Sequence, residues 1–191
     1  MWGQGNLLAM DWERHPRGNS SDPNGIGELL SRAHDAIGGA PLSGTRFVHT
    51  PREMLASSRQ IEALVAGVDT TLYVGFQRAS RLDHERDIYR DLIANGTRVV
   101  AFGRGEPRAV EGVEWVPLED RPLALENQWY LVTERPEPIA FVGFETSPAP
   151  LQATGQAAGP DKTWEGFVSG DKRLVDALVA HLEAVRAKAR D

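Results

Sequence analysis

The segment that most constrains the fold is Thr71-Leu-Tyr-Val-Gly-Phe-Gln-Arg78. Residues 71–76 carry no charge and are β-branched, aromatic, aliphatic or glycine. A short apolar run of this kind is typical of a strand buried on both faces, as in a sheet covered by helices. Polar Gln77 and Arg78 follow at once. They are therefore expected at the carboxyl end of the strand, which is the edge where open α/β sheets tend to bind ligands.

A helix and a second strand are predicted to follow this central strand. Ser80-Arg-Leu-Asp83 has the spacing of a capping box, and Asn95-Gly96 predicts a left-handed helix end. The apolar face of the helix between them comprises Leu82, Ile88, Tyr89, Leu92 and Ile93. Residues 97–102 form the next strand, so the segment predicts a βαβ unit with parallel strands and a right-handed crossover.

Another helix start is indicated by Thr50-Pro-Arg-Glu53. Thr50 can cap the helix, Pro51 suits its first position, and Glu53 completes the capping box. This helix is expected to end at Gly67 and to bury Met54, Leu55, Ser58, Ile61 and Val65.

Periodicity predicts the remaining elements. Two more helices are expected at 26–37 and 171–189, and three more strands at 113–116, 128–133 and 139–144. The apolar face of the last helix comprises Leu174, Val175, Leu178, Leu182 and Val185. The short segment 134–138 between the last two strands predicts an antiparallel hairpin.

At 191 residues the chain is long enough for one domain with a full core. The expected class is α/β, with a mixed sheet of four to five strands, the βαβ unit, the C-terminal hairpin and flanking helices. Residues 1–25 are expected to form a flexible arm whose Trp2 and Trp12 either pack onto the domain or bind a partner. Residues 26–191 would form a single domain, with a flexible loop at the uncharged segment 146–160.

Composition excludes several classes of function. A net charge of −6 and a pI of about 5.4 imply no basic surface for nucleic acid. The absence of cysteine excludes disulfides, thiolate metal sites, iron–sulfur clusters and a thiol nucleophile. The apolar run at residues 7–10 is too short for a signal peptide or a membrane span. The expected compartment is therefore the cytoplasm, with no membrane partner.

No motif marks a catalytic or metal site. Gly103-Arg-Gly105 follows a strand, but Glu106 and Pro107 stand where a dinucleotide loop needs a helix. The histidines are scattered without an i, i+4 pair, and no Gly-x-Ser-x-Gly elbow is present. One alternative remains an enzyme that uses His84 or Glu85 as its base. Another is a ligand-free scaffold held in a homo-oligomer by its C-terminal helix.

The chain resembles a DICT domain, a sensory module named for its occurrence with diguanylate cyclases and two-component proteins. The similar segments are 52–62, 72–77 and 99–103, joined by Tyr89, Leu92 and Trp164-Glu-Gly-Phe167, within residues 26–186. The last of these resembles the family's aromatic-Gly-aromatic turn. Two features depart from the family pattern: the long segment 146–160, and Val168-Ser169 where a further aromatic is common. The resemblance implies a mixed α/β sandwich around about four strands and a sensory role linked to light responses. It supplies no ligand and no catalytic residue.

These observations predict a non-enzymatic cytoplasmic sensory module. It would bind a small molecule or a signalling protein that carries the output function, and it could form a homodimer. No particular cofactor is indicated. Because Trp129 and Tyr130 are adjacent in a strand, they should point to opposite faces, so that one ring can line a pocket. The candidate ligand- or partner-binding residues are Phe76, Gln77, Arg78, Tyr89, Tyr130, Trp164 and Phe167.

Overall fold

The computed structural model of the chain describes residues 43–108, 110–118, 128–145 and 164–190, together with residues 5, 6, 35 and 38. It leaves out the side chains of residues 5, 6, 77, 128, 144 and 145. The predicted arm at 1–25 and helix at 26–37 lie outside the described residues, except for Gly5, Asn6 and the helical Asp35. The predicted loop at 146–160 also lies outside them.

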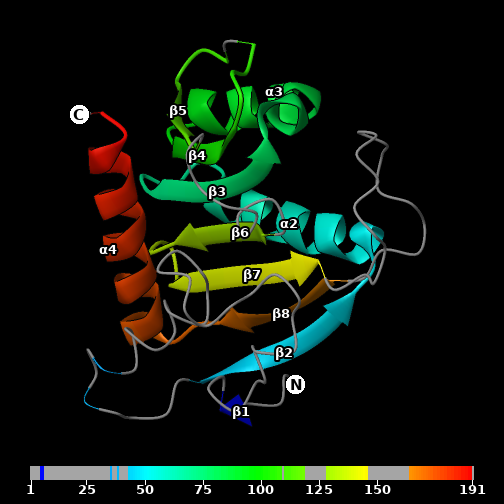
Figure 1. Ribbon diagram of the computed structural model, residues 1–191, viewed down its shortest axis with the longest axis vertical. Coiled ribbons are helices and arrows are strands. Elements are labelled where there is room, and N and C mark those ends of the chain that lie inside the picture. The colour runs from blue at the N-terminus through cyan, green and yellow to red at the C-terminus, as the bar shows by residue number, and fades with distance from the viewer. Residues whose placement is uncertain are drawn as a thin grey trace.

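A mixed β-sheet forms the centre of the molecule (Figure 1). Its strands are β1 (Gly5–Asn6), β2 (Ser43–His49), β3 (Thr71–Arg78), β4 (Arg98–Arg104), β5 (Val113–Pro117), β6 (Gln128–Thr133), β7 (Ile139–Glu145) and β8 (Trp164–Ser169). Their order across the sheet is β1-β2-β8-β7-β6-β3-β4-β5. Strands β3, β4 and β5 are parallel, and the other neighbours are antiparallel. The predicted α/β class, βαβ unit and β6–β7 hairpin are therefore confirmed.

The expected number of four to five strands was too low, because seven strands of five or more residues pair in this sheet. The two missed strands are β2 and β8, and the expected turn at 164–167 lies within β8. Gly166 lowers the strand propensity of β8 in sequence. A Cβ atom at this position would lie 2.6 Å from Phe47 Cζ and closer still to the Val142 carbonyl oxygen. Gly166 therefore makes the strand hard to predict from the sequence, and it also allows β8 to pack closely against Val142 and Phe47.

Helices cover both faces of the sheet (Figure 1). Helices α2 (Pro51–Val65) and α3 (Ala79–Ala94) pack on one face, and α4 (Lys172–Lys188) packs on the other. Alternate residues of β3 pack against the two helical layers. Leu72 and Val74 lie under α2 and α3, and Tyr73 lies on the α4 side. All three are at most 5% exposed. This confirms that β3 is buried on both faces.

Helix α2 begins as its sequence predicts. The Thr50 amide donates to Glu53 Oε2 over 2.8 Å, and the Glu53 amide donates to Thr50 Oγ1 over 3.4 Å, which completes the capping box. One residue of its predicted apolar face was wrong, because Leu55 is 39% exposed while Glu62 is buried at 3%. The buried stripe runs through Met54, Ser58, Ile61, Glu62 and Val65, and Leu55 falls to one side of it.

The predicted capping box at Ser80–Asp83 is not formed. Helix α3 begins at Ala79, and Arg78 precedes it without a side-chain cap. Strand β3 stays paired with β4 as far as Arg78 and then runs directly into the helix, so the start lies ahead of Ser80. The predicted end is confirmed by Gly96, whose φ is +99° and whose amide donates to the Ile93 carbonyl over 2.9 Å.

Helix α4 has the predicted apolar face. Leu174, Val175, Leu178 and Leu182 are buried against the sheet, and Val185 packs beside them. Asp171 caps the helix by accepting a hydrogen bond from the Arg173 amide over 3.1 Å. Within the described part of the chain, no helix combines the length and the apolar character needed to span a membrane.

Candidate functional site

Strand register aligns a row of residues across the α4 face of the sheet. Phe167 of β8 pairs with Val142 of β7, which pairs with Tyr130 of β6. Tyr130 in turn pairs with Gly75 of β3, and Gly75 with Phe102 of β4. Except for glycine, all these residues belong to the apolar cluster beneath α4. The row places Tyr130 directly beside the central strand.

The ring of Tyr130 occupies the space that a side chain at Gly75 would need. A Cβ atom on Gly75 would lie 2.6 Å from Tyr130 Cδ1 and closer still to Cε1. The ring centroid is 6.2 Å from that of Phe102, on the next strand but one. Burial raises the pKa of the Tyr130 hydroxyl above its usual value, so this group stays neutral.

Beyond Gly75, strand β3 separates from β6. The β3–β6 ladder covers only Tyr73 to Gly75, whereas the β3–β4 ladder continues to Arg78. A register shift between Gly75 and Gln77 leaves Phe76 as the extra residue of a bulge. Bulges re-aim the side chains that follow and often lie beside functional sites. Among the described residues, pairing between β3 and β6 thus stops close to the position where the sequence predicted a ligand edge.

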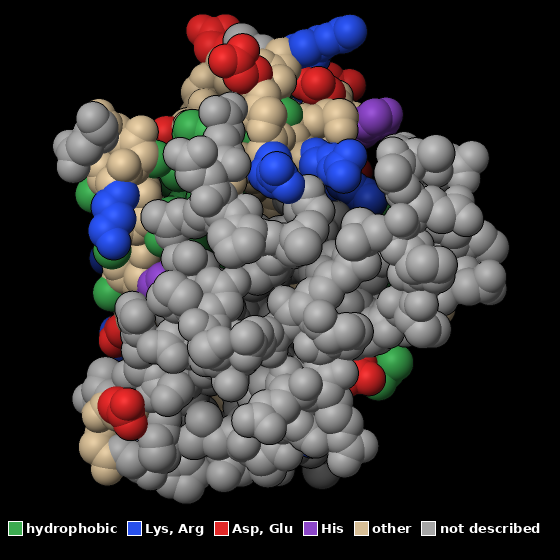
Figure 2. All heavy atoms as spheres, viewed as in Figure 1, with side chains coloured by type: hydrophobic (Ala, Val, Ile, Leu, Met, Phe, Trp, Pro, Cys, Tyr) green, Lys and Arg blue, Asp and Glu red, His purple; other side chains and the backbone are tan. Residues whose placement is uncertain are grey.

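Two arginines end the parallel strands at this edge. Arg78 of β3 and Arg104 of β4 are register partners, and α3 begins immediately after Arg78. Arg104 follows Phe102 by two residues in a strand, so alternation places it on the Phe102 and Tyr130 face. Figure 2 shows basic side chains gathered where β3 ends and α3 begins. Two arginines at neighbouring strand ends suit a carboxylate or a phosphate, which arginine can hold by two hydrogen bonds.

The sheet divides the other predicted site residues between its faces. Phe76 and Tyr89 pack edge to face at 5.1 Å on the α2 and α3 side, where Trp164 is also buried. Phe167 lies on the Tyr130 side, but β7 separates the two rings. The side chain of Gln77 lies outside the described part of the structure. Of the predicted residues, the register places Arg78 at the end of β3 and Tyr130 beside Gly75, three residues earlier in that strand. The described side chains among the predicted set are divided between the two faces and are not gathered around a single pocket.

Trp129 and Tyr130 point to opposite faces, as their adjacency predicted. Trp129 Nε1 donates to Ser58 Oγ of α2 over 3.0 Å, and its ring meets Trp164 edge to face at 5.6 Å. Trp164 is only 2% exposed. Its contacts, like those of Phe76 and Tyr89, are those of a core residue.

The sequence did not single out Glu62, which forms a buried polar contact between α2 and α3. Tyr89 Oη donates to Glu62 Oε1 over 2.6 Å, and Arg59 pairs with both Glu62 and Glu85. Burial raises the pKa of Glu62, and its hydrogen bonds with Tyr89 and Arg59 act in the opposite direction. The position of Glu62 four residues after Ser58 and eight after Met54 could have indicated that it shares their buried stripe.

The residues of the alternative acid–base site also have internal partners. His84 Nδ1 lies 2.6 Å from the Ser80 carbonyl oxygen, one turn earlier in α3. Glu85 pairs with Arg59, and both oxygens of Glu62 accept hydrogen bonds from within the protein. Among the residues that the structure describes, no group of three or more His, Asp or Glu could hold a metal ion. The contacts of Glu62, Arg59 and Glu85 join α2 to α3, and the contact of His84 lies within α3.

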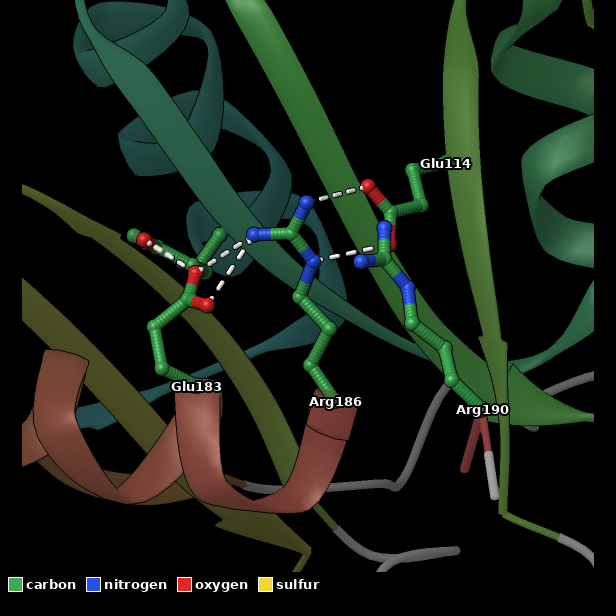
Figure 3. A network of polar contacts seen from close by, with 5 residues as sticks. Glu114, Glu183, Arg186 and Arg190 are labelled. Carbon is green, nitrogen blue, oxygen red and sulfur yellow. Dashed lines mark hydrogen bonds and ion pairs between the residues drawn. The ribbon is translucent and has the colours of Figure 1, made fainter. Parts of the chain in front are cut away.

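A second polar network fastens α4 to the parallel strands (Figure 3). The Arg186 guanidinium donates to both carboxylate oxygens of Glu114 on β5, over 2.7 and 2.6 Å, and also to Glu183. Tyr73 Oη of β3 donates to Glu183 over 2.7 Å, and Arg190 reaches Glu114. The hydrogen bonds from Arg186 lower the pKa of Glu114. The network fixes the C-terminal half of α4 against β3 and β5.

A scan against protein-family models finds no match to this chain, and searches of curated proteins and of solved structures find none either. The class of protein is therefore defined by the fold itself, an α/β protein with a mixed sheet between two helical layers. The DICT resemblance stays a prediction from the sequence.

Proposed function

We propose that this chain is a non-enzymatic sensory module that binds a small molecule or a signalling protein through an anionic group. The proposed site is the carboxyl edge of β3 and β4. The observation that carries the proposal is the register pairing of Arg78 with Arg104 at the ends of two parallel strands. Open α/β sheets bind their ligands at such edges. The start of α3 beside Arg78, without a side-chain cap, also favours negative charge there.

The chemistry of the edge supports binding over catalysis. The arginine side chain offers several hydrogen-bond donors and no acceptor, a chemistry that suits Arg78 and Arg104 to holding an anion. The carboxylates of Glu62 and Glu85, which could serve as bases, are held by Arg59. The sensory role comes from the resemblance to DICT domains. In this proposal the module works in the cytoplasm, a partner protein carries the output, and light is one candidate input.

The first experiment identifies the ligand. Protein purified from its native host is examined by absorbance and native mass spectrometry, which reveal any retained chromophore or small molecule. A retained anionic molecule supports the proposal. Native mass spectrometry of the same sample also shows whether a co-purifying protein is bound. That result distinguishes a small-molecule ligand from a signalling partner.

The second experiment tests the edge with a defined probe. Inorganic phosphate is titrated into the labelled full chain while backbone amide resonances are followed by NMR. Saturable shifts are expected at residues 78–81 and 104–105, and they should be lost in both Arg78→Gln and Arg104→Gln. Arg90→Gln is the matched control, because Arg90 lies on α3, is 60% exposed and pairs with Asp87. Equal shifts in all three variants, or no shifts in the wild type, would remove the edge as an anion site.

A further inference from the structure

Glu62 places a carboxyl group in the contact between α2 and α3. Its side chain is 4% exposed, and Tyr89 beside it is 2% exposed. Arg59 and Glu85, which complete the cluster, retain 32% and 26% exposure and so lie closer to solvent. A carboxylate in this position loses most of its hydration, a cost that its hydrogen bonds must offset.

The charges around Glu62 do not balance. Among the described residues, the charged and titratable groups that face it are Arg59 from α2, and Tyr89 and Glu85 from α3. The strand residues beneath the two helices in this cluster are apolar, namely Leu72, Val74, Val99 and Ala101. One guanidinium therefore serves two carboxylates, and one negative charge remains when both are ionised. A proton on Glu62 removes that charge, and Tyr89 can still donate to the carbonyl oxygen of the acid.

We propose that Glu62 is a proton switch between α2 and α3. When Glu62 takes up a proton, Arg59 is left to pair with Glu85 alone, and the contact between the helices tightens. When the proton is released, Glu62 and Glu85 share the single positive charge of Arg59, one buried negative charge is left uncompensated, and the contact loosens. The step transfers one proton between solvent and Glu62 and requires no other reactant.

The pKa directions agree with this geometry. Burial raises the pKa of Glu62, and the neighbouring Glu85 charge raises it further. A carboxyl group whose pKa is higher in the folded than in the unfolded state stabilises the fold most at low pH. That contribution is lost as pH rises from the unfolded value, about 4.3, through the folded value.

Another glutamate on the same helix provides a matched control. Glu53 closes the capping box, where hydrogen bonds from Thr50 lower its pKa. Its contribution to stability is therefore present at higher pH and lost as pH falls. Glu62→Gln and Glu53→Gln make the same chemical change in α2, and the proposal predicts that their pH dependences have opposite signs.

The test is urea unfolding of the wild type and both variants across the acid and neutral range. As pH rises, the stability of the wild type relative to Glu62→Gln should fall, while its stability relative to Glu53→Gln should rise. Hydrogen exchange at α3 amides, corrected for intrinsic rates, should become faster with rising pH in the wild type and not in Glu62→Gln. The proposal would be overturned if the stability of the wild type relative to Glu62→Gln rose with pH. Glu62 would then be an ordinary ion-paired carboxylate.

A direct titration keeps the proposal testable if Glu62→Gln does not fold. Carbon-13 NMR of the Glu62 carboxyl group gives its protonation midpoint in the intact wild type and in Glu85→Gln. The midpoint should lie above that of an ordinary glutamate and should fall when Glu85 is neutral. A midpoint at or below the ordinary value, or one that Glu85→Gln leaves unchanged, would show that Glu62 does not act as the switch.

Discussion

Tyr130 lies over Gly75, its register partner, and fills the space that any larger side chain at position 75 would need. An aromatic ring that folds across a glycine on the neighbouring strand is one way in which sheets compensate for the missing side chain. Here it also sets the local geometry of the candidate site, since β3 leaves β6 directly after this pair. The pair is therefore the last one between β3 and β6, and the proposed ligand edge lies just beyond it, where β3 remains paired with β4.

Gly75→Ala should destabilise the fold by about 1–3 kcal/mol, because the added methyl group overlaps the Tyr130 ring. Tyr130→Ala removes the ring atoms that cause the overlap, so the cost of Gly75→Ala should fall markedly in the double variant. Urea unfolding of the two single variants and the double variant gives the coupling energy. Additive costs would mean that the ring does not occupy this space.

Local sequence patterns predicted the elements whose determinants are local. The apolar run of β3, the Thr50 capping box of α2 and the Gly96 stop of α3 each involve residues within one turn or one strand. The capping box at Ser80 failed because pairing between β3 and β4 fixes the start of α3. That pairing joins residues distant in sequence, so the segment alone does not reveal it.

The candidate site was predicted less completely, because it also depends on pairing between residues that are distant in sequence. Strand alternation correctly separated Trp129 from Tyr130, but it could not place Phe76 relative to Tyr130 without the register of β3 and the bulge after Gly75. Arg104 was not selected because its pairing with Arg78 depends on that register as well. Glu62 was overlooked because its hydrogen bond to Tyr89 of α3 cannot be seen from the sequence of α2 alone.

Thr50→Ala should destabilise the protein by about 1 kcal/mol, because the Glu53 amide loses its hydrogen-bond acceptor at the start of α2. Thr50→Ser retains a hydroxyl acceptor and should cost much less. Thermal unfolding of the two variants provides the comparison. An equal loss in both would assign the effect to the Thr50 methyl group and not to the cap.

Arg186→Lys should destabilise the protein although it conserves the charge. Lysine cannot reproduce the paired hydrogen bonds from Arg186 to the two Glu114 oxygens while also reaching Glu183. Arg90→Lys is the control, because its pair with Asp87 is exposed, and such pairs contribute only about 0–1 kcal/mol. Urea unfolding should show the larger loss for Arg186→Lys. Similar small losses in both variants would mean that the network does not hold α4 in solution.

Asp171 joins the start of α4 to the start of β2. Its carboxylate accepts hydrogen bonds from the Arg173 side chain and amide and from the Ser43 amide, and its side chain is 6% exposed. The hydrogen bonds from Arg173 are the main reason why the pKa of Asp171 falls to about 2. Burial acts in the opposite direction and is outweighed.

This lowered pKa predicts a defined acid dependence of stability. A carboxyl group whose pKa is lower in the folded state stabilises the fold above its unfolded value, and this contribution is lost as pH falls through the folded value. Asp171→Asn removes the charge but retains a side chain that can cap α4. In urea unfolding, the wild type should exceed Asp171→Asn by a constant margin above about pH 5. The margin should shrink as pH falls from the ordinary value of 3.8 toward about 2. A margin that stays constant to the lowest pH at which both proteins fold, or that widens, would show that Asp171 is not held as a carboxylate by Arg173 and Ser43.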